Sequence, residues 1–250
     1  MLPTLLLFAI GVVSGLSSGL FGIGGALIGT PLLRVIVNMP PIYALATPLP
    51  VALPSAITGA IAYWRRGFVD RKLAQQAILI AVPMTIAGSF LTHWTSGMVL
   101  MAATAAMLIT VAVLMLRKGP KDHRPGGKPT PFRIAIVSGT AGFIAGFLAI
   151  GGGTFLVPAF VRWLGVPMHQ AIATSLVCVA AFAVPGTIVH AALGHIDWSA
   201  AFMLVFGTIP GSLLGAHLAL RIKSRLLEIL FGGLVTVFGA WFLVRTLCAQ

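Results

Sequence analysis

The chain has 250 residues, of which 58% are hydrophobic and only 8% are charged, and its formal net charge is +12. A soluble domain carries about 25% charged residues, so this chain has too few to cover a water-facing surface. The composition excludes a soluble globular protein, a disordered protein and a cytosolic enzyme. It also excludes a nucleic-acid-binding protein, because the positive charge reflects a scarcity of acidic residues. The surrounding medium must be lipid and the structural element the transmembrane helix.

Eight apolar runs follow one another along the chain and predict an all-α, polytopic membrane protein. They occupy residues 2–37, 44–64, 73–94, 98–116, 132–164, 171–193, 199–220 and 226–247. Most have the length of a helix of roughly 20 residues that crosses a hydrocarbon core of about 30 Å. Most Lys and Arg residues lie between the runs. We interpret them as residues that hold loops on the cytoplasmic side of the cell membrane, not as a binding patch for a partner.

The first and fifth runs are too long for one ordinary span, and glycines interrupt both near the middle. The interrupting residues are Gly22, Gly24 and Gly25 in the first run and Gly151, Gly152 and Gly153 in the fifth. A charged segment rich in proline and glycine separates the fourth run from the fifth. This pattern predicts a first half (1–117), a cytoplasmic linker (118–132) and a second half (133–250).

The two halves are copies of each other. Shifting the sequence by 127 positions aligns residues 15–91 with residues 142–218 without a gap, and 20 of these 77 positions are identical. Many of the identities are Gly, Pro or Asp, which a biased apolar composition would not align by chance. Internal repeats are typical of secondary transporters.

The basic residues do not repeat, and this predicts that the halves are inverted. The loop at 65–72 is rich in Arg and Lys, whereas its counterpart at 192–199 has none, so the positive-inside rule gives the halves opposite orientations. Inversion needs an odd number of crossings in each half. Re-entrant first and fifth runs meet this need; they place both termini outside, with 14 basic residues inside and 2 outside. Re-entrant second and sixth runs, which contain prolines, are the alternative.

The glycine interruptions are candidate ligand-binding positions. Glycine lets another backbone or a ligand approach closely, and a helix that starts after such a break directs its free N–H groups and positive dipole end at the break. Two converging breaks therefore predict an anion site that contains Gly24, Gly25 and 151–153. The alternative role is helix packing, which we favour for the glycines spaced four apart: Gly11, Gly15, Gly19, Gly207, Gly211 and Gly215.

The segment from Ser14 to Ala26, followed by Pro31, resembles the signature of the TauE/SafE sulfite exporter family, and 141–153 with Pro158 resembles its second copy. The resemblance covers both halves. It implies a permease for small sulfur-containing anions such as sulfite or organosulfonates. We expect no cofactor, and the sequence has no metal-ligand pattern. A passive anion channel, or a transporter of another small carboxylate or inorganic anion, is the alternative. The first copy departs from the second at Ala26 and at Pro48, where the second has Ser175.

Hydroxyl and acidic residues near the runs have two possible roles. Thr47 and Thr174 occupy equivalent positions, and Ser175 adds a hydroxyl in the second half only. They suit the oxygens of a sulfonate, or they cap helices or bond to backbone carbonyls. Asp70 and Asp197, also equivalent, precede the third and seventh runs, and we predict that they cap helix N-termini.

His190 and His217 lie inside apolar runs and are candidates for proton coupling, or they form ordinary hydrogen bonds between helices. The sequence leaves the coupling ion, the direction of transport and the oligomeric state open. The competing classes are a membrane scaffold and an intramembrane enzyme. The absence of paired acids, a metal-ligand cluster or a plausible triad weighs against an enzyme, and the inverted repeat weighs against a scaffold.

Overall fold

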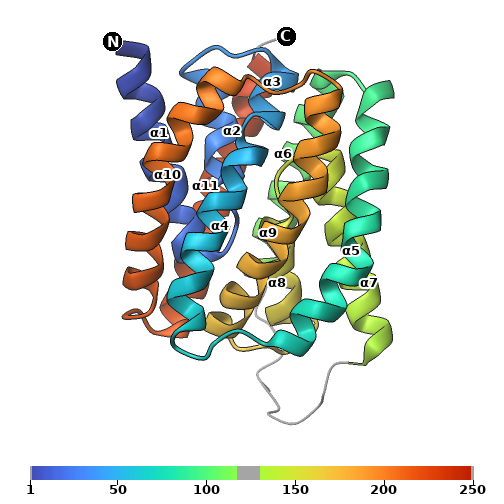
Figure 1. The fold of residues 1–250 in the computed structure, drawn as a ribbon, viewed down its shortest axis with the longest axis vertical. Coiled ribbons are helices and arrows are strands. Elements are labelled where there is room, and N and C mark those ends of the chain that lie inside the picture. The colour runs from blue at the N-terminus through green and yellow to red at the C-terminus, as the bar shows by residue number, and fades with distance from the viewer. Residues whose placement is uncertain (1, 117–129, 249–250) are drawn as a thin grey trace.

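The computed structural model describes residues 2–116 and 130–248, and these residues are helical throughout apart from short connections (Figure 1). Residues 118–129 of the predicted linker lie outside the described residues. Its last two residues, 131 and 132, already belong to a helix. The helices are α1 (Leu2–Phe21), α2 (Ala26–Val35), α3 (Pro41–Ala46), α4 (Pro48–Trp64), α5 (Arg71–Leu91), the 3-10 turn η1 (Thr92–Trp94), α6 (Gly97–Leu116), α7 (Pro131–Phe147), α8 (Gly153–Arg162), α9 (Met168–Ala192), α10 (Trp198–Ala219) and α11 (Ser224–Cys248).

Seven helical stretches in the described residues are long and apolar enough to cross a membrane, which confirms the predicted polytopic class. They correspond to α1, to α3 with α4, to α5 with η1, and to α6, α9, α10 and α11. Three apolar helices are shorter: α2, α7 and α8. All three belong to the two runs that the glycines interrupt.

The first and fifth runs break where the sequence predicts. Gly24 and Gly25 have φ values of 75° and 81°, and Gly151 and Gly152 both have φ 74°. This left-handed conformation costs an L-residue free energy, whereas glycine adopts it without that cost. Each break is followed by a helix of ten residues, α2 or α8.

Each short helix returns toward the end of the molecule from which its run began (Figure 1). A Cβ added to Gly97, at the start of α6, would lie 3.0 Å from Pro41 Cβ, so the chain after α2 is back at that end. At the opposite end, Arg162 Nη2 at the close of α8 donates to Met115 O near the close of α6 at 2.8 Å. Both breaks, in the first and fifth runs, therefore form helical hairpins.

The second run differs in detail from its prediction. It begins earlier, at Pro41, and is interrupted at Thr47 between α3 and α4. Pro48 and Pro50 have no amide hydrogen, so they cannot donate to the carbonyls one turn earlier, and the helical hydrogen bonding lapses at this point. The sixth run has a single proline, Pro185, and forms one continuous helix, α9.

Glycines bring two pairs of helices into close contact, α1 with α10 and α5 with α7. A Cβ added to Gly15 would lie 2.8 Å from Thr208 Cα, and one added to Gly142 would lie 2.7 Å from Ala81 Cα. Real Cβ atoms do not approach other atoms so closely, so only glycine fits. This confirms the packing role predicted for the spaced glycines.

Positive φ angles recur at the repeat spacing. All ten described residues with a positive φ fall into five pairs that are 127 positions apart. The pairs are Gly22 with Ala149, Gly24 with Gly151, Gly25 with Gly152, Asn38 with Gly165 and Gly67 with Gly194. The two halves of the sequence thus repeat their backbone turns as well as their residues.

Candidate functional site

The two glycine breaks lie against each other and share two neighbours, one from α4 and one from α9. A Cβ added to Gly24 would lie 2.7 Å from Val179 Cγ1 and 3.6 Å from Ala52 Cβ. The corresponding distances for Gly151 are 3.5 Å and 3.7 Å. Ala52 and Val179 are themselves 127 positions apart. The predicted convergence of Gly24 with Gly151 is therefore present in the structure.

Gly153 and Gly152 fill the remaining space of the second break. A Cβ on Gly153 would lie 2.8 Å from Ile23 Cα, so the start of α8 packs directly against the backbone of the first break. A Cβ on Gly152 would lie 2.9 Å from Ala145 Cβ and 3.0 Å from the Phe182 ring. The residues nearest to the break glycines are all uncharged.

Among the described residues, the helices that start at the breaks lack a side-chain cap, as α3, α4, α7 and α9 also do, whereas α5 and α10 have one. Asp70 and Asp197 accept hydrogen bonds at 3.0 Å from the amides of Leu73 and Ala200, which confirms both predicted caps. Within the described residues, by contrast, the N-cap positions of α2 and α8, Gly25 and Gly152, have no side-chain hydrogen bond. Two helix N-termini thus sit inside the protein with their dipoles uncompensated by a capping side chain, an arrangement that favours an anion.

Buried hydroxyl groups without a partner lie beside these helix starts, and the sequence analysis did not single them out. In the part of the chain that is described, the Ser14, Thr30 and Thr154 hydroxyls are buried and make no hydrogen bond. Ser14 Oγ would lie 3.3 Å from a Cβ on Gly29, and its residue borders Gly25. The sequence signal that could have identified them is a Ser or Thr inside an apolar run and close to a glycine break.

A small cavity of about 10 Å³ lies at the first break, between Ser14, Gly25, Pro48 and Thr208. This is space for about one water molecule, because a single water needs roughly 10–15 Å³ by this kind of measure. The break is therefore closed around its uncapped helix start in the conformation described.

Ser175 is the predicted hydroxyl that lies at a break. Its Oγ is 2.9 Å from Gly22 O and 3.0 Å from Ile172 O. Carbonyl oxygens only accept, so the two share the single proton of the Ser175 hydroxyl, and the contact with Gly22 O ties α9 to the first break.

Thr47 and Thr174 make a different and matching pair of contacts. Thr174 Oγ1 accepts from the Asp70 amide and Thr47 Oγ1 accepts from the Asp197 amide, both at 3.1 Å. Each contact joins the start of one helix to a residue more than 100 positions away. Asp70 Oδ2 also accepts from Gln170 Nε2 at 3.3 Å. The threonine oxygens are thus engaged with the capping residues of α5 and α10.

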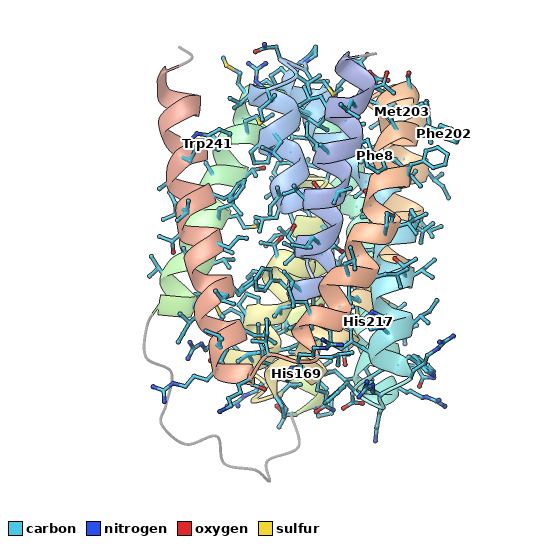
Figure 2. The ribbon with its side chains drawn as sticks, turned by 90° about the vertical axis from the view of Figure 1, so that its left-hand side faces the viewer. Phe8, His169, Phe202, Met203, His217 and Trp241 are labelled. Atoms are coloured by element: carbon cyan, nitrogen blue, oxygen red, sulfur yellow. The ribbon has the colours of Figure 1, made fainter. Side chains whose placement is uncertain are left out.

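The two candidate histidines are placed differently. His190 is buried, with Nε2 3.2 Å from Gly146 O and Nδ1 3.2 Å from Nδ1 of His195. Because a carbonyl only accepts, Nε2 of His190 carries the proton and its Nδ1 accepts from His195. His217 is exposed on α10, with Nδ1 2.8 Å from Leu213 O (Figure 2). Only His190 of the two lies inside the protein.

His195 lies in the connection between α9 and α10, outside the membrane-spanning helices. Burial lowers its pKa below the ordinary value, and the nearby His93 lowers it further by charge repulsion. Three histidines from separate segments therefore stand near one end of the molecule, and the local surroundings of His195 favour its neutral form.

The family model described as sulfite exporter TauE/SafE matches residues 7–242. A "probable membrane transporter protein" of Xylella fastidiosa (strain Temecula1) is 29% identical over 246 residues, which covers 94% of this chain and 93% of the relative. The "probable membrane transporter protein YjnA" of Bacillus subtilis (strain 168) is 25% identical over 243 residues, which covers 92% of this chain and 95% of the relative. These similarities run through both glycine breaks.

Proposed function

The chain belongs to the sulfite exporter TauE/SafE family of multi-pass membrane transporters, and on this premise we propose that it carries a small sulfur-containing anion, sulfite or an organosulfonate, by alternating access. The observation that carries the proposal is the contact between the two glycine breaks inside the protein, each followed by a helix whose N-cap, Gly25 or Gly152, has no side-chain hydrogen bond. An oxyanion there accepts hydrogen bonds from backbone amides and lies at the positive ends of two helix dipoles.

The uncharged surroundings of the breaks bear on the choice of substrate. Hydroxyls such as Ser14 and Thr154 donate to the oxygens of sulfite or a sulfonate, and the residues nearest to the breaks include no carboxylate to repel them. A site without a fixed cation also releases its anion readily, because no ion pair has to be broken. Transport requires such release in every cycle.

We further propose that the halves 1–117 and 133–250 are inverted repeats that rock about the breaks. The paired positive φ angles support this. So does an equivalent contact made within each half: Tyr63 Oη donates to Gly19 O at 3.0 Å, and His190, 127 positions later, bonds to Gly146 O, which is 127 positions after Gly19. Inverted repeats of this kind give transporters a site at the interface of the repeats.

In the proposed transport cycle, the structure corresponds to the closed state that lies between the inward-open and the outward-open states. The cavity of about 10 Å³ at the first break is too small for sulfite, and both Thr–Asp contacts are made. The two contacts lie at opposite ends of the molecule. Asp70 belongs to the α4–α5 connection and Asp197 to the α9–α10 connection, and these two connections are at opposite ends (Figure 1). In the proposed cycle one contact opens while the other holds. Proton binding at His190 is the proposed coupling step.

Basic residues support the proposed orientation, with both termini outside. Nine described Lys and Arg gather at the end formed by the α4–α5 and α10–α11 connections, whereas Arg34 lies at the other end. The nine are Arg65, Arg66, Arg71, Lys72, Arg133, Arg162, Arg221, Lys223 and Arg225. The positive-inside rule makes their end cytoplasmic.

Flux through proteoliposomes tests the function. Purified protein should give saturable uptake of labelled sulfite, and an excess of unlabelled sulfite inside should accelerate entry of the label by counterflow. Sulfoacetate should compete, and acetate should not. A passive channel would give flux that rises linearly with concentration and shows no counterflow. Transport of acetate in preference to every sulfur-containing anion would refute the proposed substrate class.

A further inference from the structure

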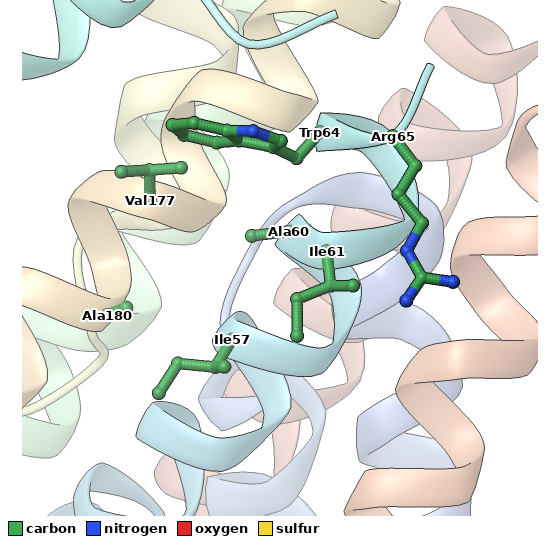
Figure 3. A pocket seen from close by; sticks show the side chains of 7 residues that line it. All are labelled: Ile57, Ala60, Ile61, Trp64, Arg65, Val177 and Ala180. Atoms are coloured by element: carbon green, nitrogen blue, oxygen red, sulfur yellow. The ribbon is translucent and has the colours of Figure 1, made fainter. Parts of the chain in front are cut away.

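An apolar groove of about 410 Å³ opens on the outer surface between α4 and α9, away from the glycine breaks (Figure 3). Ile57, Ala60 and Ile61 line it from α4, and Val177 and Ala180 from α9. Ile57 and Ile61 are 44% and 46% exposed, so the groove is a surface feature, open to lipid. Its walls carry almost nothing with which water or a polar ligand could form hydrogen bonds.

The groove ends at a tryptophan and a cluster of cations. Trp64 extends from α4 toward Val177, whereas the Arg65 side chain extends back along α4 to the level of Ile61, away from the Trp64 ring (Figure 3). The guanidinium of Arg71 lies 4.6 Å from the centre of the Trp64 ring. Arg66 and Lys72 are exposed in the same connection. The acid nearest in sequence, Asp70, is engaged in capping α5 and in bonding Gln170.

We propose that this groove is a binding site for an anionic phospholipid, with one acyl chain between α4 and α9 and the phosphate at Arg71, beside Trp64. The seven-residue step from Ile57 to Trp64 spans about 10 Å of helix, the reach of the upper part of one acyl chain. Tryptophan prefers the interface between hydrocarbon and headgroups, so Trp64 marks the depth at which the chain ends and the headgroup begins. Arg71 stands at that level, against the Trp64 ring.

Charge favours a lipid over a second copy of this chain as the occupant. A two-fold dimer through this face would bring the basic 65–72 connections of both copies to the same height, where like charges repel. An anionic headgroup has the complementary sign. The positions equivalent to Trp64 and Arg65 are Ala191 and Ala192, so the opposite end of the α4–α9 face has no such cap.

Lipid titration of the purified protein in detergent tests the site, with native mass spectrometry as the readout. Phosphatidylglycerol should bind more tightly than phosphatidylcholine of the same chain length. Arg71→Gln should weaken phosphatidylglycerol binding by about fivefold, the effect of one cation at an anionic lipid. Arg221→Gln removes the same charge from the same end, outside the groove, and should leave binding within twofold. Inorganic phosphate should not compete, because it has no chain.

The groove itself is tested by polar substitution. Ile61→Gln should weaken binding of both lipids, whereas Ile188→Gln, its exposed repeat counterpart on α9, should not. Equal losses in Arg71→Gln and Arg221→Gln would show mere attraction to a basic surface and overturn the site. So would unchanged binding in Ile61→Gln. A dimer that forms without lipid and dissociates in Ile61→Gln would assign the face to a second copy instead. These measurements do not depend on the transported anion.

Discussion

The hydroxyl oxygen of Thr174 accepts a hydrogen bond from the backbone amide of Asp70 at 3.1 Å, and so joins α9 to the start of α5. Thr47 and Asp197 form the same contact at the same distance at the other end of the molecule. The two contacts share residue types and repeat positions. At each end the contact joins two segments in the same way.

We expect Thr174→Val to lower the free energy of unfolding by about 1–2 kcal/mol, because valine keeps the shape but leaves the Asp70 amide without its acceptor. Chemical unfolding in detergent measures this. Thr110→Val is the control, since its hydroxyl bonds only to Ala106 O in its own helix and is exposed. If Thr174→Val is as stable as wild type but binds substrate more weakly, the hydroxyl serves the ligand and not the closed end.

The break glycines allow a comparison at constant backbone conformation. Gly24 and Gly67 have nearly the same φ, 75° and 74°, but a Cβ on Gly24 would lie 2.7 Å from Val179 Cγ1 while one on Gly67 meets nothing within 4 Å. Gly67→Ala should therefore cost about 1 kcal/mol of stability for the left-handed conformation alone and leave transport intact. Gly24→Ala should cost clearly more.

A rescue separates overlap from backbone strain. Because the overlapping atom is the tip of a side chain, Gly24→Ala combined with Val179→Ala should recover most of the additional loss, as measured in a double-mutant cycle of thermal stability. Strictly additive effects would show that the two residues do not meet. Gly153→Ala offers no such remedy, since its Cβ would meet the backbone of Ile23.

Local features of the fold could be predicted from sequence, whereas pairings across the halves could not. Asp70 before an apolar run indicates a cap, and clustered glycines indicate a break. The Thr174–Asp70 contact spans 104 positions, and nothing local indicates it. His217 shows a second reason why the sequence alone could not place a candidate residue. Its helix is apolar on nearly all sides, so the sequence has no polar face that would distinguish the lipid side from the interior.

The pKa of His195, lowered by burial and by His93, predicts how stability depends on pH. As the pH falls below about 6.5, the ordinary histidine pKa, the unfolded chain takes up a proton that the folded protein resists. Stability should therefore be full above that pH and decline below it, until the lower folded-state pKa is reached. His195→Gln should flatten the decline in melting temperature between about pH 7 and pH 5. The same decline in His195→Gln as in the wild type would show that another group sets this pH dependence.

Cysteine labelling tests the proposed orientation. In a variant whose two native cysteines are replaced by alanine, Ser96→Cys should react with a membrane-impermeant thiol reagent in intact cells, and Arg66→Cys should react only after the cells are opened. The η1–α6 and α4–α5 connections that carry these residues lie at opposite ends (Figure 1). The reverse pattern would place the basic end outside and contradict the proposed topology.

Ser14 provides the sharpest test of the proposed anion site, because its contribution to binding and its contribution to stability should have opposite signs. Its hydroxyl is buried beside the start of α2 without a partner among the described residues. Removing such a group should leave the empty protein equally stable or slightly more stable, since an unpaired buried hydroxyl carries a desolvation cost. If the hydroxyl donates to a bound oxyanion, Ser14→Ala should weaken sulfite binding by about 1–3 kcal/mol.

Ser17→Ala is the matched control: Ser17 is buried on the same helix, but its hydroxyl donates to Val13 O at 2.8 Å. It should change stability and leave affinity alone. Calorimetric titration and thermal unfolding of both variants decide the matter, and equal sulfite affinity in Ser14→Ala and wild type would remove Ser14 from the site.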